Sequence, residues 1–283
     1  MSSHEYIIVK KITPAYWRAT FNNGNLNLLS PESYVALKNL VAELEADKDV
    51  RVIVFDSSSP DYFIAHADLL RVGEEPEGPG TGLGATWPSL AVRIANLSAI
   101  TVVAVRGRAR GFGADFANTC DLRFASRERA VFCQPELGAG IIPGGGAFEW
   151  LPRLVGRARA LEILISSDDY DATTAELYGW INRAVPDAEF EDFVEKLARR
   201  IAGFDAKLLV ETKRVVNARW GMPNQVDFAA GMALFAESTK WPGAGPRIKA
   251  LFEKGMQQDG ETERNMGAVL GTITEEDLKK HSA

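Results

Sequence analysis

The sequence predicts an α/β protein whose N-terminal part repeats a strand–strand–helix unit and whose C-terminal part is helical. Short apolar runs rich in β-branched residues alternate with segments of helical period through the first part of the chain. From Asp187 onward, apolar residues recur only at helical spacing. A chain of 283 residues permits one large domain with a helical appendage. We therefore expect a core domain at residues 1–204 and a helical subdomain at residues 205–283.

The first unit begins with two predicted strands at residues 6–12 and 16–21, joined by a turn at Thr13-Pro14. A helix should begin at Ser30-Pro31, because serine caps a helix N-terminus and proline is favoured at its first position. Its apolar residues recur at helical spacing up to Asp47: Leu37, Leu40, Val41 and Leu44. Residues 51–56 are nearly all apolar and predict a strand buried in a parallel layer.

The later elements continue this rhythm. Residues 73–86 are rich in glycine, proline and acidic side chains and predict a mobile loop. An apolar strand at 101–105 runs into a glycine-bearing loop at 107–113, which opens a helix carrying Asp115. A second strand pair then delivers the segment Gln134-Pro135-Glu136. Helices are expected over 192–202, 206–218 and 225–239.

The loop at 107–113 suits an oxyanion. Glycine frees the backbone just before a helix start, where the first N–H groups have no partner within the helix. Those groups point outward at the positive end of the helix dipole. The carboxyl groups of Asp115 and Glu136 could flank an oxyanion bound there.

Four sets of residues carry a longer signature that includes this loop. They are Phe63-Ile64-Ala65-His66-Ala67-Asp68-Leu69, the stretch from Gly107 to Asp115 with Cys120-Asp121, Gln134-Pro135-Glu136, and Ile142-Pro143-Gly144-Gly145-Gly146. In this order they resemble the crotonase family, also called the enoyl-CoA hydratase/isomerase superfamily. The resemblance covers roughly residues 5 to 205. It implies a crotonase-like spiral of β-β-α units, a CoA thioester as substrate, no resident cofactor and no metal. It also implies a homotrimer or a dimer of trimers.

The resemblance makes Glu136 the leading catalytic residue. It follows Pro135 in an apolar, glycine-rich stretch, where burying a carboxylate without purpose would be costly. Burial would raise its pKa and make it a competent general acid or base. The alternative is a glutamate that ion-pairs with a neighbouring arginine such as Arg110.

Asp115 occupies the position of the family's second carboxylate, which in hydratases is usually glutamate. Aspartate is shorter by one methylene group, and this changes its reach toward a water molecule. The alternative is a first-turn acid that only stabilises its own helix dipole. Aspartate here also occurs in the family's dienoyl isomerases, but those carry a further aspartate where this chain has Gly144.

The resemblance places the oxyanion hole at the backbone N–H groups of Ala67 and Phe112. Gly111, Gly113 and Gly144 match the family's structural glycines, whereas Phe112 and His66 stand where the family has glycine. A backbone donor survives any side chain except proline, so Phe112 keeps the hole. A positive φ at Phe112 would strain it. His66 is either a loop residue hydrogen-bonded to backbone or a base or oxyanion donor.

CoA recognition should involve the segment that contains Ala65, Asp68, Leu69 and Arg71. Two departures from the family weaken this expectation. The loop after the second strand is Asn22-Asn23-Gly24-Asn25, where a basic residue is common, and Leu70 replaces a frequent lysine. Because a polyphosphate needs local cations, the available candidates are Arg71, Arg108 and Arg110.

Composition supports a globular enzyme and excludes several other classes. Hydrophobic residues make up 46% and charged residues 25%, which is ordinary for a cytoplasmic protein. A net charge of −6 argues against a nucleic-acid partner bound mainly by electrostatics. No apolar run reaches the roughly eighteen residues of a membrane span, and the start lacks a secretory signal. Cys120 and Cys133 suggest no disulfide framework, so we expect a reducing, cytoplasmic location.

Three functions follow from these observations. The first is hydration or dehydration of an α,β-unsaturated acyl-CoA, with Glu136 exchanging a proton with carbon and Asp115 helping to hold the water. The second is a crotonase-fold hydrolase or isomerase acting on a carbonyl compound without CoA, such as a β-diketone, with His66 or Asp115 activating water. The third is a non-catalytic binding protein for RNA, supported only by the arginines of residues 106–110.

Overall fold

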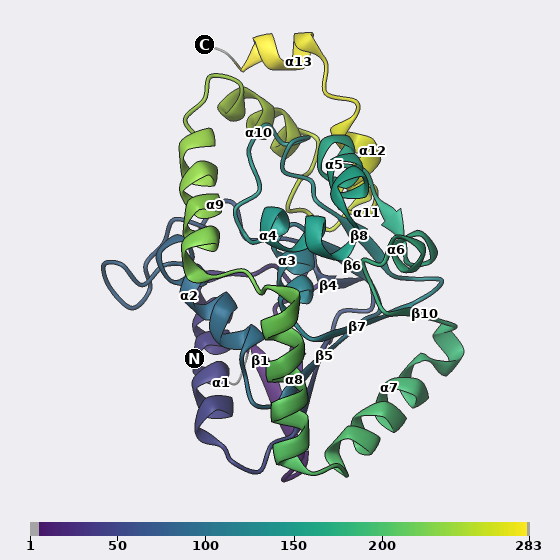
Figure 1. Ribbon diagram of the computed structural model, residues 1–283. Coiled ribbons are helices and arrows are strands. Elements are labelled where there is room, and N and C mark those ends of the chain that lie inside the picture. Colours follow the sequence, from purple (N-terminus) through teal and green to yellow (C-terminus); the bar gives the residue numbers. More distant parts are fainter. Residues whose placement is uncertain (1–5, 282–283) are drawn as a thin grey trace.

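The structure is a computed structural model that describes residues 6–281 (Figure 1). Its larger sheet has six strands in the order β1-β2-β3-β5-β7-β10. These strands are β1 (Ile7–Thr13), β2 (Tyr16–Phe21), β3 (Val52–Ser57), β5 (Ile100–Val105), β7 (Leu122–Ser126) and β10 (Arg183–Val185). β1 and β2 form an antiparallel pair, and all other neighbours in this sheet are parallel. The strands predicted at 6–12, 16–21, 51–56 and 101–105 are confirmed to within a residue or two.

The smaller sheet has four strands in the order β4-β6-β8-β9. They are β4 (Tyr62–Ile64), β6 (Arg108–Arg110), β8 (Val131–Cys133) and β9 (Tyr170–Asp171). Consecutive strands alternate between the sheets, since β3, β5 and β7 join the larger one and β4, β6 and β8 join the smaller one. Each repeat therefore adds one strand to each sheet. This is the spiral of β-β-α units that the sequence predicts.

Three helices of the core position the site: α1 (Pro31–Ala46), α2 (Leu83–Ala95) and α3 (Phe112–Thr119). The predicted start of α1 is confirmed, because Ser30 caps it by accepting a hydrogen bond from the Ser33 N–H and Pro31 is its first residue. α3 is buried along its whole length. Its Phe116 ring packs edge-on against Phe21 of β2 and Phe55 of β3, with centroid distances of 5.2 and 5.1 Å. These aromatic contacts fix the depth of α3 in the core.

The predicted loop at 73–86 is partly wrong, because residues 83–86 form the first turn of α2. The glycines of this segment favour a loop prediction, but tertiary contacts stabilise the start of a helix here. The Thr86 hydroxyl bonds to the Gly82 carbonyl at 3.0 Å and to the Tyr34 hydroxyl at 2.7 Å. Trp87 is fully buried. The loop at 107–113 also needs correction, since it contains strand β6 and the first residues of α3.

The remaining regular elements are helices α4 (Ala147–Leu154), α5 (Arg157–Ser166), α6 (Ala172–Tyr178), α7 (Asp187–Ala202), α8 (Ala206–Trp220), α9 (Gln225–Ser238), α10 (Ala244–Glu253), α11 (Glu261–Arg264), α12 (Met266–Leu270) and α13 (Glu275–Lys280). α7 begins at Asp187, earlier than the predicted residue 192, and its Phe190 and Val194 pack on the larger sheet. α8 is tied to the core because Lys213 lies 2.7 Å from the carboxylate of Asp121. In Figure 1, α8 runs along the lower front of the molecule, α9 lies above it on the left, and α10 and α13 lie at the top of the view. Among the described helices, none is long and apolar enough to span a bilayer.

Candidate active site

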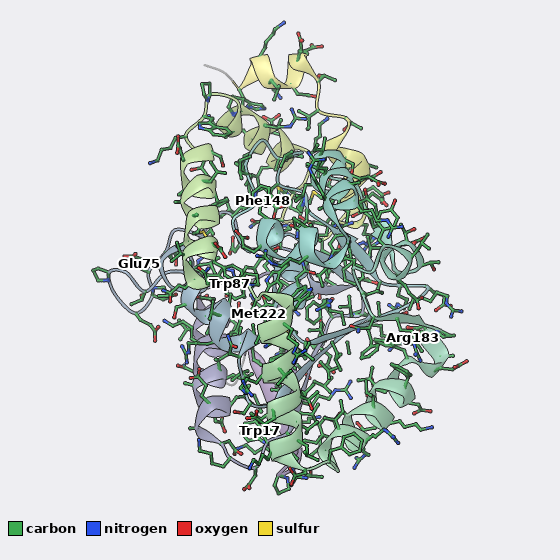
Figure 2. The ribbon with its side chains drawn as sticks, in the orientation of Figure 1. Trp17, Glu75, Trp87, Phe148, Arg183 and Met222 are labelled. Atoms are coloured by element: carbon green, nitrogen blue, oxygen red, sulfur yellow. The ribbon has the colours of Figure 1, made fainter. Side chains whose placement is uncertain are left out.

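A cavity of about 630 Å³ opens beside α2, α3 and α9. Its wall contains residues that the sequence singled out, among them His66, Ala67, Phe112, Asp115 and Glu136. They come from the loop after β4, the first turn of α3 and the loop after β8. In Figure 2, Trp87, which packs behind this wall, lies well inside the molecule, and Glu75 marks the outlying loop before α2. The chain therefore brings three distant motif segments to one cavity.

Glu136 lines this cavity. The residue is partly buried, and its Oε2 atom has no contact with solvent and no hydrogen-bond partner among the described residues. Burial raises its pKa to about 7, against the lowering effects of its own backbone N–H and of the His66 charge. The alternative of an ion pair with Arg110 is wrong, because the Arg110 guanidinium binds the Asp169 carboxylate at 2.6 Å. A carboxyl group that titrates near neutrality suits proton transfer.

Asp115 lies in the first turn of α3, but it does not face solvent. Its side chain is only 1% exposed, and its Oδ1 atom accepts a hydrogen bond of 2.9 Å from the Gln134 amide. Its Oδ2 atom lies so close to the backbone of Gly145 that no side chain fits at that glycine. Burial raises the pKa of Asp115 well above its ordinary value, and the negative charge of Glu136 raises it further.

The two carboxyl groups titrate as a pair. Each raises the cost of a negative charge on the other, so the protons leave in two steps that belong to both groups. Burial raises the pKa of Glu136 to about 7, and burial together with the charge of Glu136 raises the pKa of Asp115 well above its ordinary value. Between these two steps the pair holds one proton. A site in that state can donate a proton to one atom and accept a proton from another.

Two backbone N–H groups on the cavity wall, those of Ala67 and Phe112, have no backbone acceptor within residues 6–281. The Leu29 N–H donates to the His66 carbonyl, and the Asp68 N–H donates to the Leu29 carbonyl, both at 3.0 Å. In this parallel bridge the intervening Ala67 directs its own N–H away from Leu29. Phe112 is the first residue of α3, so its N–H has no partner within the helix.

The phenyl ring of Phe112 is accommodated without backbone strain. Among the described non-glycine residues, positive φ occurs at Asn27, Ser167 and Gln257, and Phe112 is outside this group. Its ring packs edge-on against Trp87 with a centroid distance of 4.6 Å. The Trp87 indole N–H in turn donates to the Gly145 carbonyl at 2.7 Å. Phe112 therefore narrows the cavity on the side of α2.

The three structural glycines predicted from the sequence each permit a close contact at the site. Gly111 has φ of 48°, and a Cβ atom there would lie 2.9 Å from the Glu136 Oε1 atom. Gly113 lies against the Ile64 carbonyl, and Gly144 against the Cβ atom of Phe235 in α9. Side chains at these positions would displace Glu136 in the loop after β8, the end of β4 or helix α9.

His66 is 4% exposed and uses both ring nitrogens within the protein. Nδ1 lies 2.7 Å from the Ala67 carbonyl oxygen, as the backbone-bonded interpretation expects. Nε2 lies 3.1 Å from the Oε1 atom of Glu263, a fully buried carboxyl group in α11. Burial lowers the pKa of His66, but the hydrogen bond and charge of Glu263 outweigh this and raise it overall.

The residues expected to recognise CoA lie in different environments. Leu69 lines the main cavity, whereas Ala65 is buried beside Leu26 and Tyr62. Asp68 accepts a hydrogen bond of 2.9 Å from the Gln257 amide and borders a separate hollow of about 380 Å³. That hollow is also lined by Asn23, Asn25, Glu32 and Arg71, so the loop after β2 and the segment after β4 meet there.

The three candidate cations already have partners. Arg71 lies 2.7 Å from carboxylate oxygens of both Glu32 and Glu74. Arg108 donates to the Arg264 carbonyl at 2.8 Å, and Arg110 is fully buried, which excludes it from binding a phosphate. Arg106 is ion-paired with Asp187. The arginines of residues 106–110 therefore form no free basic surface. These arginines were the only support for an RNA-binding function, so the structure gives that function no support.

Two parts of the site were missed from the sequence. One is the wall formed by α9, which contributes Ala229, Met232, Ala233, Phe235 and Ala236 to the cavity. The helical period at 225–239 predicts the helix, but nothing local shows where it packs. The other is Glu263, which is 197 residues from its partner His66. Only the unusual histidine in the loop after β4 signals that a partner is needed.

Comparison with known proteins finds similarity to enoyl-CoA hydratases. The family model described as Enoyl-CoA hydratase/isomerase matches residues 16–257. Crotonyl-CoA hydratase of Syntrophomonas wolfei is 31% identical over 204 residues, which is 72% of this chain and 77% of that protein. Short-chain-enoyl-CoA hydratase of Clostridium acetobutylicum is 29% identical over the same shares of the two chains.

Solved structures agree over nearly the whole chain. A crystal structure from Streptomyces avermitilis, provisionally assigned as an enoyl-CoA hydratase, is 40% identical with a TM-score of 0.89. The match covers 97% of this chain and 99% of that one. An enoyl-CoA hydratase/isomerase from Pseudoalteromonas atlantica T6c is 25% identical, with a TM-score of 0.76 and coverage of 88% and 97%.

Proposed function

Because this chain belongs to the enoyl-CoA hydratase/isomerase family and has the crotonase fold, we propose that it adds water to, or removes water from, an α,β-unsaturated acyl-CoA. One observation carries the proposal. The coupled carboxyl groups of Asp115 and Glu136 line the same cavity as two outward-facing N–H groups, those of Ala67 and Phe112. The thioester is the substrate, and the proposed reaction uses no resident cofactor.

The N–H groups would act on the thioester carbonyl. When water adds to the β-carbon, negative charge moves onto the carbonyl oxygen and an enolate forms. Donors from Ala67 and Phe112 stabilise that charge in a cavity that Phe112 and α9 line with apolar side chains. Neither donor has to reorganise, since one is held by the bridge to Leu29 and the other by the start of α3.

The carboxyl pair would move the protons. In dehydration, the Glu136 carboxylate takes the proton from the α-carbon, and protonated Asp115 gives a proton to the departing hydroxyl group. Hydration is the reverse, with Asp115 accepting the proton of water and Glu136 delivering one to carbon. The singly protonated pair contains the one proton that either direction needs. The arrangement with the proton on Asp115 begins dehydration, and the positive charge of His66 favours it by lowering the pKa of Glu136.

The pH dependence of dehydration follows from this pair. Below about pH 7 the Glu136 carboxylate becomes protonated and the base is lost, so kcat/KM is expected to fall by about tenfold per pH unit. At high pH, Asp115 loses its proton and the acid is lost. Rates with a 3-hydroxyacyl-CoA across the pH range check this. A profile that stays flat well below pH 7 would remove Glu136 as the titrating base.

The hollow beside Arg71 is the place we propose for the phosphates of CoA. Asn23 and Asn25 offer amide donors there, and Arg71 could exchange one of its carboxylate partners for a phosphate oxygen. Arg71→Ala should raise KM several-fold with little change in kcat, because an exposed charge–phosphate contact contributes on the order of 1 kcal/mol. Arg93→Ala is the matched control, since Arg93 forms a similar exposed pair with Glu45. Equal effects of the two substitutions on KM would place CoA elsewhere.

A second function is supported by the fact that the three candidate arginines for CoA binding already have partners within the protein. Since Arg71, Arg108 and Arg110 all have partners, the chain could act as a hydrolase or isomerase on a carbonyl compound without CoA. A ligand that binds only the folded state raises the midpoint of thermal unfolding. We expect saturated acyl-CoA esters to raise it and free β-diketones to leave it unchanged. The opposite result would favour the second function and would make Arg71→Ala silent.

We also propose that the chain assembles as a homotrimer or a dimer of trimers. The surface of α8 exposes Leu208 by 68% and Val216 by 58%, and Trp220 is also exposed. A cavity of about 730 Å³ lies beneath this helix. Apolar area of this kind is typical of a surface covered by another subunit. Light scattering at micromolar concentration should give at least three times the 30.9 kDa mass of the chain. A monomer would contradict the assembly.

A further inference from the structure

We propose that His66 and Glu263 form a buried positioning pair that orients the Ala67 peptide and holds a positive charge beside Glu136. This inference rests on the proposed function for its catalytic consequence, but not for its existence. The crotonase-family pattern has glycine at the position of His66. The pair is therefore a feature of this chain and does not follow from the fold.

The hydrogen bonds of His66 indicate a doubly protonated ring. Nδ1 lies 2.7 Å from the Ala67 carbonyl oxygen, which can only accept a hydrogen bond. Nε2 lies 3.1 Å from Glu263 Oε1, and that oxygen already accepts a hydrogen bond of 2.6 Å from the Gln257 N–H. A neutral imidazole carries one N–H and could donate to only one of these acceptors. An imidazolium facing a carboxylate satisfies both.

The groups around the pair support the ionised form. Burial and Arg110 of β6 lower the pKa of His66 and Glu263 of α11 raises it, with a net rise. The charge of His66 in turn lowers the pKa of Glu136 in the loop after β8. Glu263 faces His66, Arg110 and the Tyr62 hydroxyl of β4. Burial raises the pKa of Glu263, but the hydrogen bond and charge of His66 lower it overall, and Arg110 adds to this. The positive charges of His66 and Arg110 therefore favour a carboxylate at Glu263.

Hydrogen bonds from Arg110 and from the loop after β4 hold the C-terminal segment that contains Glu263 in place. Arg110 donates to the Glu263 carbonyl at 2.5 Å, which anchors the backbone of α11. The side chain of Gln257 spans the same gap, since it accepts from the Leu69 N–H at 2.6 Å and donates to Asp68 at 2.9 Å. Residues 257–263 thus contact the loop after β4 at His66, Asp68 and Leu69.

Two consequences follow for the site. First, the Leu29 N–H donates to the His66 carbonyl, which shares a peptide unit with the Ala67 N–H. The hydrogen bond from Nδ1 to the Ala67 carbonyl restrains the next peptide unit, so the two together hold the Ala67 N–H toward the cavity. Second, the His66 charge favours the anionic form of Glu136. That charge directs the shared proton to Asp115. Because both ring nitrogens are engaged, His66 acts through its neighbours and does not take a proton from substrate.

Histidine NMR tests the pair without any assay of activity. In protein labelled with ¹⁵N-histidine, the His66 signals are identified by their loss in His66→Gln. At pH 7 we expect both ring nitrogens of His66 to carry protons. Glu263→Gln, which keeps the shape but removes the charge, should lower the proton affinity of His66 by about tenfold or more. Glu261→Gln on the same helix, where Glu261 contacts Asn265, should leave it unchanged. A neutral His66 ring at pH 7 in the unaltered protein overturns the proposal, whatever reaction the enzyme catalyses.

Kinetics then test the catalytic consequence. Glu263→Gln should shift the acid limb of kcat/KM to higher pH, because Glu136 loses its positive neighbour and becomes harder to ionise. At pH 7 we expect a loss of about tenfold that recovers as the pH rises. A role confined to folding would instead lower activity equally at all pH values. An acid limb that does not move in Glu263→Gln, with Glu261→Gln as reference, contradicts the positioning role.

A third experiment measures stability instead of activity, so it still tests the pair if the single variants are destabilised. His66→Gly restores the family residue but leaves the fully buried Glu263 without its cation. The double variant with Glu263→Gln removes that unpaired charge. We therefore expect the double variant to unfold at a higher urea concentration than His66→Gly alone. Equal or lower stability of the double variant would show that the two side chains are not coupled.

Discussion

Glu136→Gln is expected to lower kcat by about a hundredfold to ten-thousandfold while leaving the fold and ligand affinity nearly intact. The amide has the size of the carboxyl group but cannot exchange a proton with carbon. Glu136 Oε2 has no hydrogen-bond partner among the described residues, so the substitution breaks no structural contact of that atom. Turnover of an enoyl-CoA and binding of a saturated acyl-CoA, measured on the same preparation, separate chemistry from affinity.

The control for this substitution is Glu189→Gln, an exposed glutamate in the first turn of α7. Its activity should match that of the unaltered protein. Near-normal kcat in Glu136→Gln would remove Glu136 from the mechanism. The carboxyl pair would then no longer explain the reaction, and Asp115 would have to act alone.

Arg110→Ala is expected to lower the free energy of unfolding by about 3–5 kcal/mol, because it removes the cation from a buried ion pair. The Arg110 guanidinium is fully buried, and it joins Asp169 to the carbonyl oxygens of Glu263 and Arg264. Its loss removes one donor from each of these acceptors, of which the Arg264 carbonyl keeps Arg108 and Asp169 keeps the Gly267 N–H, and it frees the segment that holds the loop after β4. Urea unfolding at constant pH measures the change.

Arg108→Ala is the matched control for Arg110. Arg108 also donates to the Arg264 carbonyl, at 2.8 Å, but it does so at the surface. Exposed contacts of this kind contribute at most about 1 kcal/mol. Similar losses of stability in the two variants would show that the buried network around Arg110 does not hold the C-terminal segment.

Features encoded by neighbouring residues could be predicted from the sequence. Ser30-Pro31 marks the start of α1, and the apolar runs mark four strands of the larger sheet, because capping and strand burial leave local patterns. The resemblance of the motif segments then places Asp115, Glu136, Ala67 and Phe112 on one cavity, and the structure brings these residues together.

Contacts between distant segments could not be predicted. Glu263 meets His66 across 197 residues, and no pattern around either residue shows that pairing. From the sequence, Arg110 could pair with Glu136 or bind a phosphate, but in the folded protein it forms an ion pair with Asp169. The start of α2 was missed for a similar reason, since Thr86 and Trp87 are stabilised by Tyr34 and Gly145, which lie on other elements.

The most direct test of the proposed reaction is the turnover of crotonyl-CoA by the unaltered protein, followed through the loss of the conjugated enoyl thioester. We predict hydration to 3-hydroxybutyryl-CoA that depends on Glu136 and falls on both sides of a pH optimum. If crotonyl-CoA and related enoyl thioesters neither bind to the protein nor react, the assignment of an acyl-CoA substrate is contradicted.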